Sequence, residues 1–432
     1  MVNKLILGLL GSLFLSLSLA MPVQEKRSAA IPAAKHSFSL RRQMVPRAKM
    51  TLGSTFRNLR VLQGAADPQP AGIDTALAAH LQVEYLVNVT VANHNYSLII
   101  DTGSSDTWFV KSGFQCLNGY RQRVPLIQCR FGPEFQGDFP GGQIKEQRFQ
   151  VAYGDGVTGP YLNGDYGYAN ITVAGVTIPN QQIALATLGY WNGDGISSGI
   201  LGLGMPGLTE AIISGGSGAG QSSTVNAIEY SPLVVTMSNN SDIAPMFSLG
   251  LSRDPAESFL ALGGVPRNVE VGDWATTPLR KWTTTTGSEY LWYTMQPERF
   301  LWNNSDISQI DARPPPVIVD SGTTMNYLPP QIVQAIHSAY VPRAVYDPEQ
   351  GSYFVNCDAV PPSFGVDING TVLWTLPSSM ILPEVKNSRG QCSTGFIDTT
   401  QQPYILGDVF MQGLVAVFEL GDVNQMRFAK RI

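Results

Sequence analysis

The chain contains 432 residues, of which 44% are hydrophobic, 9% aromatic and 14% charged. So much apolar material excludes a largely disordered protein, and the length suits two or three globular units of roughly 150 residues each. A net charge of −5 argues against a nucleic-acid-binding protein, and four histidines without a His-Glu-x-x-His sequence argue against a multi-histidine metal site.

The N-terminus has the layout of a secretory signal peptide. Lys4 precedes an apolar run at residues 5–19, which ends in the small-residue sequence Ser18-Leu19-Ala20. The run is shorter than the roughly 20 apolar residues that a membrane-spanning helix needs. We therefore predict a signal peptide at 1–20 and no membrane anchor. Secretion is the expected destination, with delivery to a vacuole as the alternative.

Residues 21–70 form a basic segment with nine Lys and Arg residues against two acidic ones, a net charge of +7. The rest of the chain, residues 71–432, carries 18 basic and 31 acidic residues, a net charge of −13. Such a segment could be a nucleic-acid or membrane-binding arm, a solvated linker, or a prosegment held by charge. Its position after a signal peptide, and the dibasic pairs Lys26-Arg27 and Arg41-Arg42, favour the prosegment.

The cysteines and the glycosylation sequons agree with a secretory route. Four cysteines permit three disulfide connectivities; pairing each with its neighbour in sequence closes two local loops, each worth on the order of 3 kcal/mol. The cysteines are Cys116, Cys129, Cys357 and Cys392. The candidate glycosylation sites are Asn88, Asn95, Asn170, Asn239, Asn303 and Asn369.

From about residue 80 the pattern is typical of β structure. Short apolar runs between Gly, Asn and Pro predict strands, for example at residues 85–91, 171–178 and 414–420. One clear helix is predicted at 330–340, with proline at its start. The Gly- and Ser-rich stretch 209–224 predicts a surface loop.

A weak internal repeat carries the candidate chemistry. Leu98-Ile-Ile-Asp101-Thr-Gly-Ser104-Ser recurs as Val317-Ile-Val-Asp320-Ser-Gly-Thr323-Thr. About a hundred residues after the first copy comes Gly199-Ile-Leu-Gly-Leu203, and after the second comes Tyr404-Ile-Leu-Gly-Asp408. In each half, an apolar strand that ends in Asp drives the carboxyl group out of water, and the following Gly allows a sharp turn.

One such motif alone predicts no more than a turn, but two in matching contexts predict a pair of carboxyl groups. If the halves pack about a two-fold axis, Asp101 and Asp320 face each other. Two close carboxylates cannot both ionise easily, so one keeps a proton. The pair would then supply an acid and a base in one site and could activate water.

These motifs resemble those of the pepsin-like aspartic proteases, most closely the secreted fungal ones, over roughly residues 80–432. Five matching segments occur in order: Ile99-Ile-Asp101-Thr-Gly-Ser-Ser-Asp-Thr-Trp108, Val151-Ala-Tyr153-Gly-Asp-Gly156, Phe247-Ser-Leu-Gly-Leu-Ser-Arg253, Val317-Ile-Val-Asp320-Ser-Gly-Thr-Thr324 and Tyr404-Ile-Leu-Gly-Asp-Val-Phe410. The resemblance implies an all-β, bilobal fold with an active-site cleft between two similar lobes, the N-terminal lobe at 71–248 and the C-terminal lobe at 249–432.

The resemblance also implies roles for individual residues. Asp101 and Asp320 would be the catalytic pair that holds the attacking water. Ser104 and Thr323 would hydrogen-bond the outer carboxylate oxygens, and Thr102 and Ser321 would brace the site across the two-fold. The remaining implied residues are Gly103 and Gly322 beside the dyad, and Tyr153, Gly154, Asp155 and Trp108 at the flap. The insert at 131–147, between the first motif and Tyr153, is expected to alter the cleft entrance.

The function implied is a secreted aspartic endopeptidase, made as a zymogen, that hydrolyses proteins at acidic pH. It would be a monomer without metal or organic cofactor, inhibited by its own prosegment through Lys35 or Lys49, with Lys35 slightly favoured. Two alternatives remain. A catalytically inactive relative would serve as an inhibitor or binding protein, and a glycosidase would also use two carboxylates.

Overall fold

A computed structural model describes residues 30–44, 83–154, 159–213, 227–284, 287–303, 305–306 and 314–432. Residues Pro32–Ile432 belong to one compact unit. The predicted signal peptide, most of the basic segment including Lys49, and Asp155 of the predicted flap lie outside the described residues. Within the described part, no helix is long and apolar enough to span a bilayer.

The largest sheet has ten strands in the order β11-β10-β6-β7-β8-β5-β9-β4-β3-β2. Its strands are β2 (Arg41–Met44), β3 (Val83–Val91), β4 (His94–Asp101), β5 (Thr107–Leu117), β6 (Gln143–Ala152), β7 (Tyr161–Val173), β8 (Val176–Tyr190), β9 (Gly199–Gly202), β10 (Ala211–Ile213) and β11 (Ala227–Ile228). Because β7 also pairs with β3, part of this sheet forms a closed ring of paired strands, which consists of β3, β4, β9, β5, β8 and β7. This closure buries the apolar faces of the strands in the first half of the chain.

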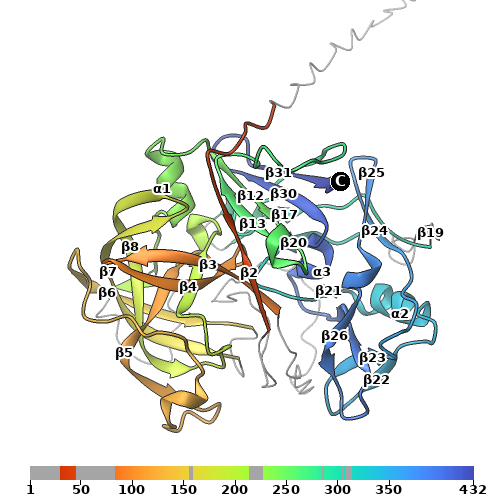
Figure 1. The fold of residues 1–432 in the computed structure, drawn as a ribbon, viewed down its shortest axis with the longest axis horizontal. Coiled ribbons are helices and arrows are strands. Elements are labelled where there is room, and N and C mark those ends of the chain that lie inside the picture. Colours follow the sequence, from red (N-terminus) through yellow and green to blue (C-terminus); the bar gives the residue numbers. More distant parts are fainter. Residues whose placement is uncertain are drawn as a thin grey trace, which may run out of the picture. The chain divides into compact units, whose positions relative to one another are not determined.

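A six-stranded sheet in the order β1-β13-β12-β30-β31-β14 joins strands from both ends of the chain. Its strands are β1 (His36–Ser39), β12 (Met246–Gly250), β13 (Phe259–Leu262), β14 (Ala275–Pro278), β30 (Leu414–Glu419) and β31 (Gln425–Lys430). The segment 247–253 therefore enters this sheet as β12. In Figure 1, β12, β13, β30 and β31 lie between the group β3–β8 on the left and the strands β22–β26 on the right.

The second half of the chain forms a five-stranded sheet, two four-stranded sheets and a two-stranded one. The five-stranded sheet consists of β17 (Thr294–Met295), β20 (Val317–Val319), β29 (Tyr404–Leu406), β21 (Asn326–Leu328) and β28 (Phe396–Asp398). One four-stranded sheet consists of β19 (Ser305–Asp306), β18 (Arg299–Trp302), β24 (Phe364–Ile368) and β25 (Thr371–Trp374), and the other of β22 (Val345–Asp347), β23 (Ser352–Val355), β27 (Cys392–Thr394) and β26 (Ile381–Lys386). The two-stranded sheet pairs β15 (Trp282–Thr283) with β16 (Ser288–Glu289). The α-helices are α1 (Leu233–Asn239), α2 (Pro330–Ser338) and α3 (Asp408–Met411). The predicted all-β, bilobal fold is confirmed.

The sequence repeat is also a repeat of topology. In the first half, β4 pairs in parallel with β9, and β5 pairs antiparallel with the other side of β9. In the second half, β20 pairs in parallel with β29, and β21 pairs antiparallel with β29. Each Asp-(Thr/Ser)-Gly turn therefore lies beside a strand of the type apolar-apolar-Gly, as the spacing of the motifs predicts.

Two of the predicted elements differ from the structure. Residues 171–178 are not one strand, because Ala174 and Gly175 take positive φ values of 61° and 70° and turn the chain from β7 into β8. The predicted loop 209–224 contains β10, which pairs with β6. The strands predicted at 85–91 and 414–420 and the helix at 330–340 are confirmed, with the helix ending at Ser338.

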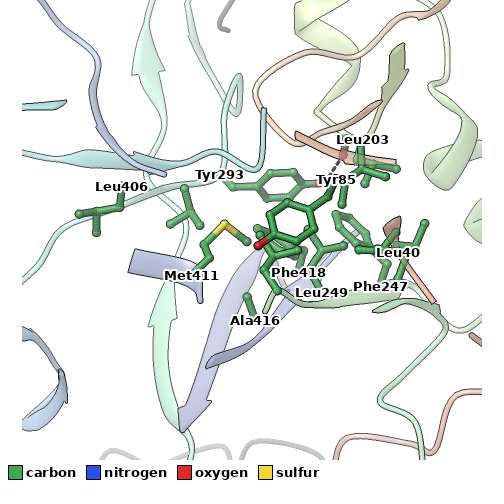
Figure 2. Close-up of a cluster of buried hydrophobic side chains, with 14 of the residues drawn as sticks. Leu40, Tyr85, Leu203, Phe247, Leu249, Tyr293, Leu406, Met411, Ala416 and Phe418 are labelled. Atoms are coloured by element: carbon green, nitrogen blue, oxygen red, sulfur yellow. Dashed lines mark hydrogen bonds between the residues drawn. The ribbon is translucent and has the colours of Figure 1, made fainter. Parts of the chain in front are cut away.

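The described part of the basic segment is built into the compact unit. β1 pairs with β13, and β2 pairs with β3. Between them, Leu40 is 1% exposed and packs in the cluster that includes Tyr85 and Phe247 (Figure 2). Burying a leucine side chain contributes roughly 1.5–3 kcal/mol. Arg42 adds an ion pair with Glu384 at 2.9 Å, so opposite charges of segment and body do meet.

Lys35 does not reach the predicted catalytic pair. The pairing of His36–Ser39 with β13 fixes the chain beside the six-stranded sheet, where Lys35 is exposed. Among the residues that the structure describes, Lys35 has no ion-pair partner. Lys35, the slightly favoured candidate, is thus not seen paired with a carboxyl group, and Lys49 lies outside the described residues, so the choice between the two lysines stays a prediction.

Candidate active site

The two Asp-containing turns of the repeat meet inside the compact unit. Asp101 is the last residue of β4, opposite Gly202 of β9, and Asp320 directly follows β20. Each carboxyl group lies against the glycine of the opposite turn, and each affects the pKa of the other. Asp101 is 1% exposed and Asp320 is fully buried. The arrangement is a pair of adjoining carboxyl groups with almost no contact with bulk water.

Two glycines allow this close approach. A Cβ atom on Gly103 would lie 2.7 Å from the carboxylate atoms of Asp320. A Cβ atom on Gly322 would overlap Oδ1 of Asp101. Each glycine thus lies against the carboxyl group of the opposite half, and no other residue type fits there without moving it.

Each carboxyl group accepts the same set of hydrogen bonds from its own turn. The backbone N–H of Gly103 donates to Oδ1 of Asp101 at 2.8 Å, and the Ser104 hydroxyl donates to Oδ2 at 2.5 Å. In the other half, the N–H of Gly322 donates to Oδ1 of Asp320 at 2.8 Å, and the Thr323 hydroxyl donates to Oδ2 at 2.7 Å. These donors fix the orientation of both carboxyl planes.

The residues after the two aspartates bind the halves to each other. The Thr102 hydroxyl donates to the Val319 carbonyl at 3.0 Å and accepts from the N–H of Ser321 at 2.9 Å. The Ser321 hydroxyl donates to the Ile100 carbonyl at 3.1 Å and accepts from the N–H of Thr102 at 3.2 Å. Each buried hydrogen bond contributes roughly 1 kcal/mol, and together the four hold the base of the site.

The surroundings keep protons on the pair. Burial, and after it the Asp320 carboxylate, raises the pKa of Asp101 well above its usual range. Burial also raises the pKa of Asp320, while hydrogen bonds from Thr323, Asp101 and Gly322 oppose the rise. The pair therefore holds a shared proton to a higher pH than an isolated carboxyl group would.

A tyrosine near Asp101 is bound by a tryptophan. Tyr153 follows the end of β6, and its hydroxyl accepts a hydrogen bond from Trp108 Nε1 at 2.7 Å. Burial, and next the Asp101 charge, raises the pKa of Tyr153 well above its usual range, so its hydroxyl stays protonated. Gly154 has a φ of 73° and begins the turn at the end of the β6–β7 hairpin. The predicted partners Tyr153 and Trp108 do lie together.

The comparisons with known proteins agree with this geometry. The sequence model of the family described as eukaryotic aspartyl protease matches residues 84–431. The chain belongs to this family. It is a pepsin-like aspartic-type endopeptidase.

Relatives of the protease include fungal and mammalian enzymes. A probable aspartic-type endopeptidase of Aspergillus fumigatus is 32% identical over 362 residues, which cover 80% of this chain and 78% of that protein. An acid protease of Saccharomycopsis fibuligera is 27% identical over 98% of each chain. The crystal structure of an aspartic proteinase from Irpex lacteus matches 90% of this chain and 98% of its own, with a TM-score of 0.59 and 17% identity, which shows a shared fold.

Other predicted residues of the protease are placed as follows. The disulfides are Cys116–Cys129 and Cys357–Cys392, the local pairing. All six sequon asparagines are exposed. The insert 131–147 contributes Phe131, which stacks on Trp191 at 5.9 Å and meets Trp108 edge-on at 6.2 Å. The insert thus packs through Phe131 against the tryptophan that binds Tyr153.

Three residues near the site were not predicted. Trp292 Nε1 donates to the Gly103 carbonyl at 3.1 Å, which ties the second half to the first Asp turn. Asp408 is fully buried, and burial, with Asp320 next, raises the pKa of its carboxyl group well above the usual range. Asp106 is 2% exposed. The burial of Asp408 could have been predicted from its position just after the apolar strand 404–406. Nothing in the sequence around Trp292 indicates its contact with the first Asp turn.

Proposed function

We propose that the protease is a secreted endopeptidase that works at acidic pH, and that Asp101 and Asp320 are its catalytic pair. The observation that carries the assignment is the meeting of the two buried carboxyl groups, each with the same set of donors. Support for an acidic range comes from the raised pKa values of both groups. Support for secretion comes from the signal-like residues 1–20 and the two disulfides.

In this proposal the dyad acts as acid and base at once. The ionised carboxylate removes a proton from a water molecule, whose oxygen attacks the peptide carbonyl carbon. The protonated carboxyl donates its proton to the carbonyl oxygen, which gives a neutral tetrahedral diol. Proton transfer to the peptide nitrogen and back to the dyad then breaks the C–N bond and releases a carboxylic acid and an amine. Tyr153, its phenol fixed by the hydrogen bond from the buried Trp108, would close over the substrate.

Digestion of denatured haemoglobin tests the proposal against the two alternatives. The protease, incubated at a series of pH values with and without a pepstatin-type inhibitor, should cleave haemoglobin below about pH 5 and be blocked by the inhibitor. Inhibitor binding without cleavage at any pH would indicate an inactive relative. Cleavage of a glycan substrate but not of haemoglobin would indicate a glycosidase.

The basic segment 21–70 is proposed to act as an inhibitory prosegment. Support comes from the strands β1 and β2, which occupy sheet edges of the body, and from the Arg42–Glu384 ion pair. Acid would protonate carboxyl groups of the body, weaken the attraction and release the segment for cleavage. Lys49 remains a candidate for the lysine that lies against the dyad.

An inactive proform separates acid-triggered release from processing by another protease. The Asp101→Asn proform, starting at residue 21, is incubated over a range of pH with active enzyme or with none, and its mass is followed. We expect it to stay intact alone and to lose the segment in acid when active enzyme is present. If it stays intact in acid until a dibasic-cleaving protease is added, the acid trigger is wrong. If wild-type proform is fully active at neutral pH with residues 21–70 attached, the inhibitory role is wrong.

A further inference from the structure

A second buried carboxylate lies five residues after the first catalytic aspartate and takes no part in the dyad. Oδ1 of Asp106 accepts hydrogen bonds from the hydroxyls of Tyr166 and Tyr230, each at 2.6 Å. The backbone N–H of Glu210 donates to Oδ2 at 3.1 Å. Burying a carboxylate away from water is costly, so such a group persists where several donors compensate it. Here the donors come from segments far apart in the chain.

The three donors belong to two neighbouring hairpins. Tyr166 is in β7, the second strand of the hairpin β6–β7, here called the flap hairpin. Glu210 directly precedes β10, and Tyr230 follows β11 by two residues; β10 and β11 form the side hairpin. The side hairpin pairs with the flap hairpin through Ala211↔Phe149. Asp106 is therefore the point where both hairpins bind the turn after Asp101.

Aromatic packing extends from this carboxylate to the flap tyrosine. Tyr166 meets Phe149 of β6 edge-on at 5.5 Å and Tyr230 edge-on at 5.7 Å. Phe149 and Tyr166 belong to the same buried apolar cluster as Trp108 and Tyr153, and the partly buried Tyr230 packs against it. Trp108 follows Asp106 by two residues and donates to the Tyr153 hydroxyl. Any movement of the hairpins relative to Asp106 would thus also move Tyr153.

Both tyrosine hydroxyls are suited to be permanent donors. Burial, and after it the Asp106 charge, raises the pKa of Tyr166 and of Tyr230 well above the usual range. Hydrogen bonds to an ionised acceptor are about twice as strong as neutral ones. The cluster therefore binds the hairpins more firmly than the short β10–β6 pairing would alone.

We propose that Asp106 is a positioning residue and that the side hairpin braces the flap hairpin through it, so that Tyr153 is held in place for substrate. This inference rests on the proposed function in one respect, the assignment of Tyr153 to the flap. It adds residues that touch neither the substrate nor the dyad. Loss of the brace should weaken substrate binding, which requires a placed flap, more than the chemistry at Asp101 and Asp320.

The test removes single hydroxyl groups. Tyr230→Phe and Tyr166→Phe each delete one donor to Asp106 and keep the ring. Tyr340→Phe is the matched control, because its buried hydroxyl donates to the Met380 carbonyl in the second half of the chain. For each variant, amide hydrogen exchange is measured without substrate in β6, β7 and β10, and kcat and KM are measured with a peptide substrate at acidic pH.

We expect Tyr230→Phe to speed amide hydrogen exchange in these three strands. We also expect it to raise KM by about tenfold and to leave kcat within about twofold of the wild-type value. The reason is that the loss of one hydrogen bond to a charged group changes an equilibrium constant by about a factor of ten or more. Tyr340→Phe should change neither. The inference is wrong if exchange in Tyr230→Phe matches that of Tyr340→Phe. It is also wrong if exchange rises but KM stays unchanged, because the cluster would then serve stability alone. The exchange readout needs no activity, so it stays decisive even if the dyad assignment fails.

Discussion

Asp101→Asn is expected to abolish peptide hydrolysis while leaving the fold intact. An asparagine keeps the shape of the side chain and can still accept the Gly103 N–H bond, but it cannot share a proton with Asp320. Because general acid–base catalysis contributes about 10²–10⁴-fold and both roles depend on the pair, we expect kcat to fall by at least about 10³-fold. The same holds for Asp320→Asn.

Asp138→Asn is the matched control for both variants. Asp138 is an exposed carboxylate that pairs with Lys111 on the surface, so its loss should leave kcat unchanged. Circular dichroism and thermal unfolding of all three variants show whether each is folded. Substantial hydrolysis by a well-folded Asp101→Asn or Asp320→Asn protein would contradict the assignment of the dyad.

The protease is expected to lose stability as pH rises from about 4 to neutrality. Burial raises the pKa of Glu84 and Asp408 well above the usual range, as it does for Asp101 and Asp320. In the unfolded chain these groups release their protons near pH 4, whereas the folded protein keeps them. The folded state then binds more protons, so the free energy of unfolding falls with rising pH, by about 1.4 kcal/mol per pH unit for each proton kept.

One histidine changes the free energy of unfolding in the opposite direction, but its contribution is too small to reverse the trend. Burial lowers the pKa of His337 to about 3, so the unfolded chain takes up a proton below about pH 6.5 that the folded protein does not. This contribution destabilises the protein as pH falls, by at most about 1.4 kcal/mol per pH unit. Three kept protons, one each on Glu84, Asp408 and the dyad, outweigh it.

Urea unfolding at pH 4, 5, 6 and 7 measures this dependence. The midpoint should fall steadily as pH rises, and Asp408→Asn should make the fall less steep because it removes one group that must ionise. Asp138→Asn again serves as the control and should follow the wild type. A midpoint that rises between pH 4 and 7 would show that the buried carboxyl groups do not hold their protons in the folded state.

The dyad and its donors were predictable because their signals are local and repeated. An apolar strand that ends in Asp-(Thr/Ser)-Gly occurs twice, and the strands β9 and β29 follow at similar distances. The same local logic failed at residues 171–178, where a continuous apolar pattern hid the turn at Ala174 and Gly175. Alternation and apolar runs identify strands, but they do not distinguish one strand from a tight hairpin.

Contacts between distant segments could not be predicted. Asp106 stands in the same motif as Asp101 and Trp108, but nothing in that motif points to its partners Tyr166 and Tyr230, which lie 60 and 124 residues away. The basic segment was predicted from its charge as a separate region, yet Leu40 is part of the core (Figure 2). Composition reports the charge of a segment, whereas pairing with β13 and β3 decides where it lies.

The shared proton of Asp101 and Asp320 is tested most directly by the pH dependence of kcat/KM. The measurement uses the wild-type enzyme, with a peptide substrate that has no ionisable side chains and with folding checked at each pH. A bell-shaped profile with its maximum below about pH 5 is expected, because the pair is active only while it holds one proton, and activity falls when it gains a second or loses the first. A maximum near neutral pH, in protein that is folded at every pH measured, would contradict the shared proton of Asp101 and Asp320.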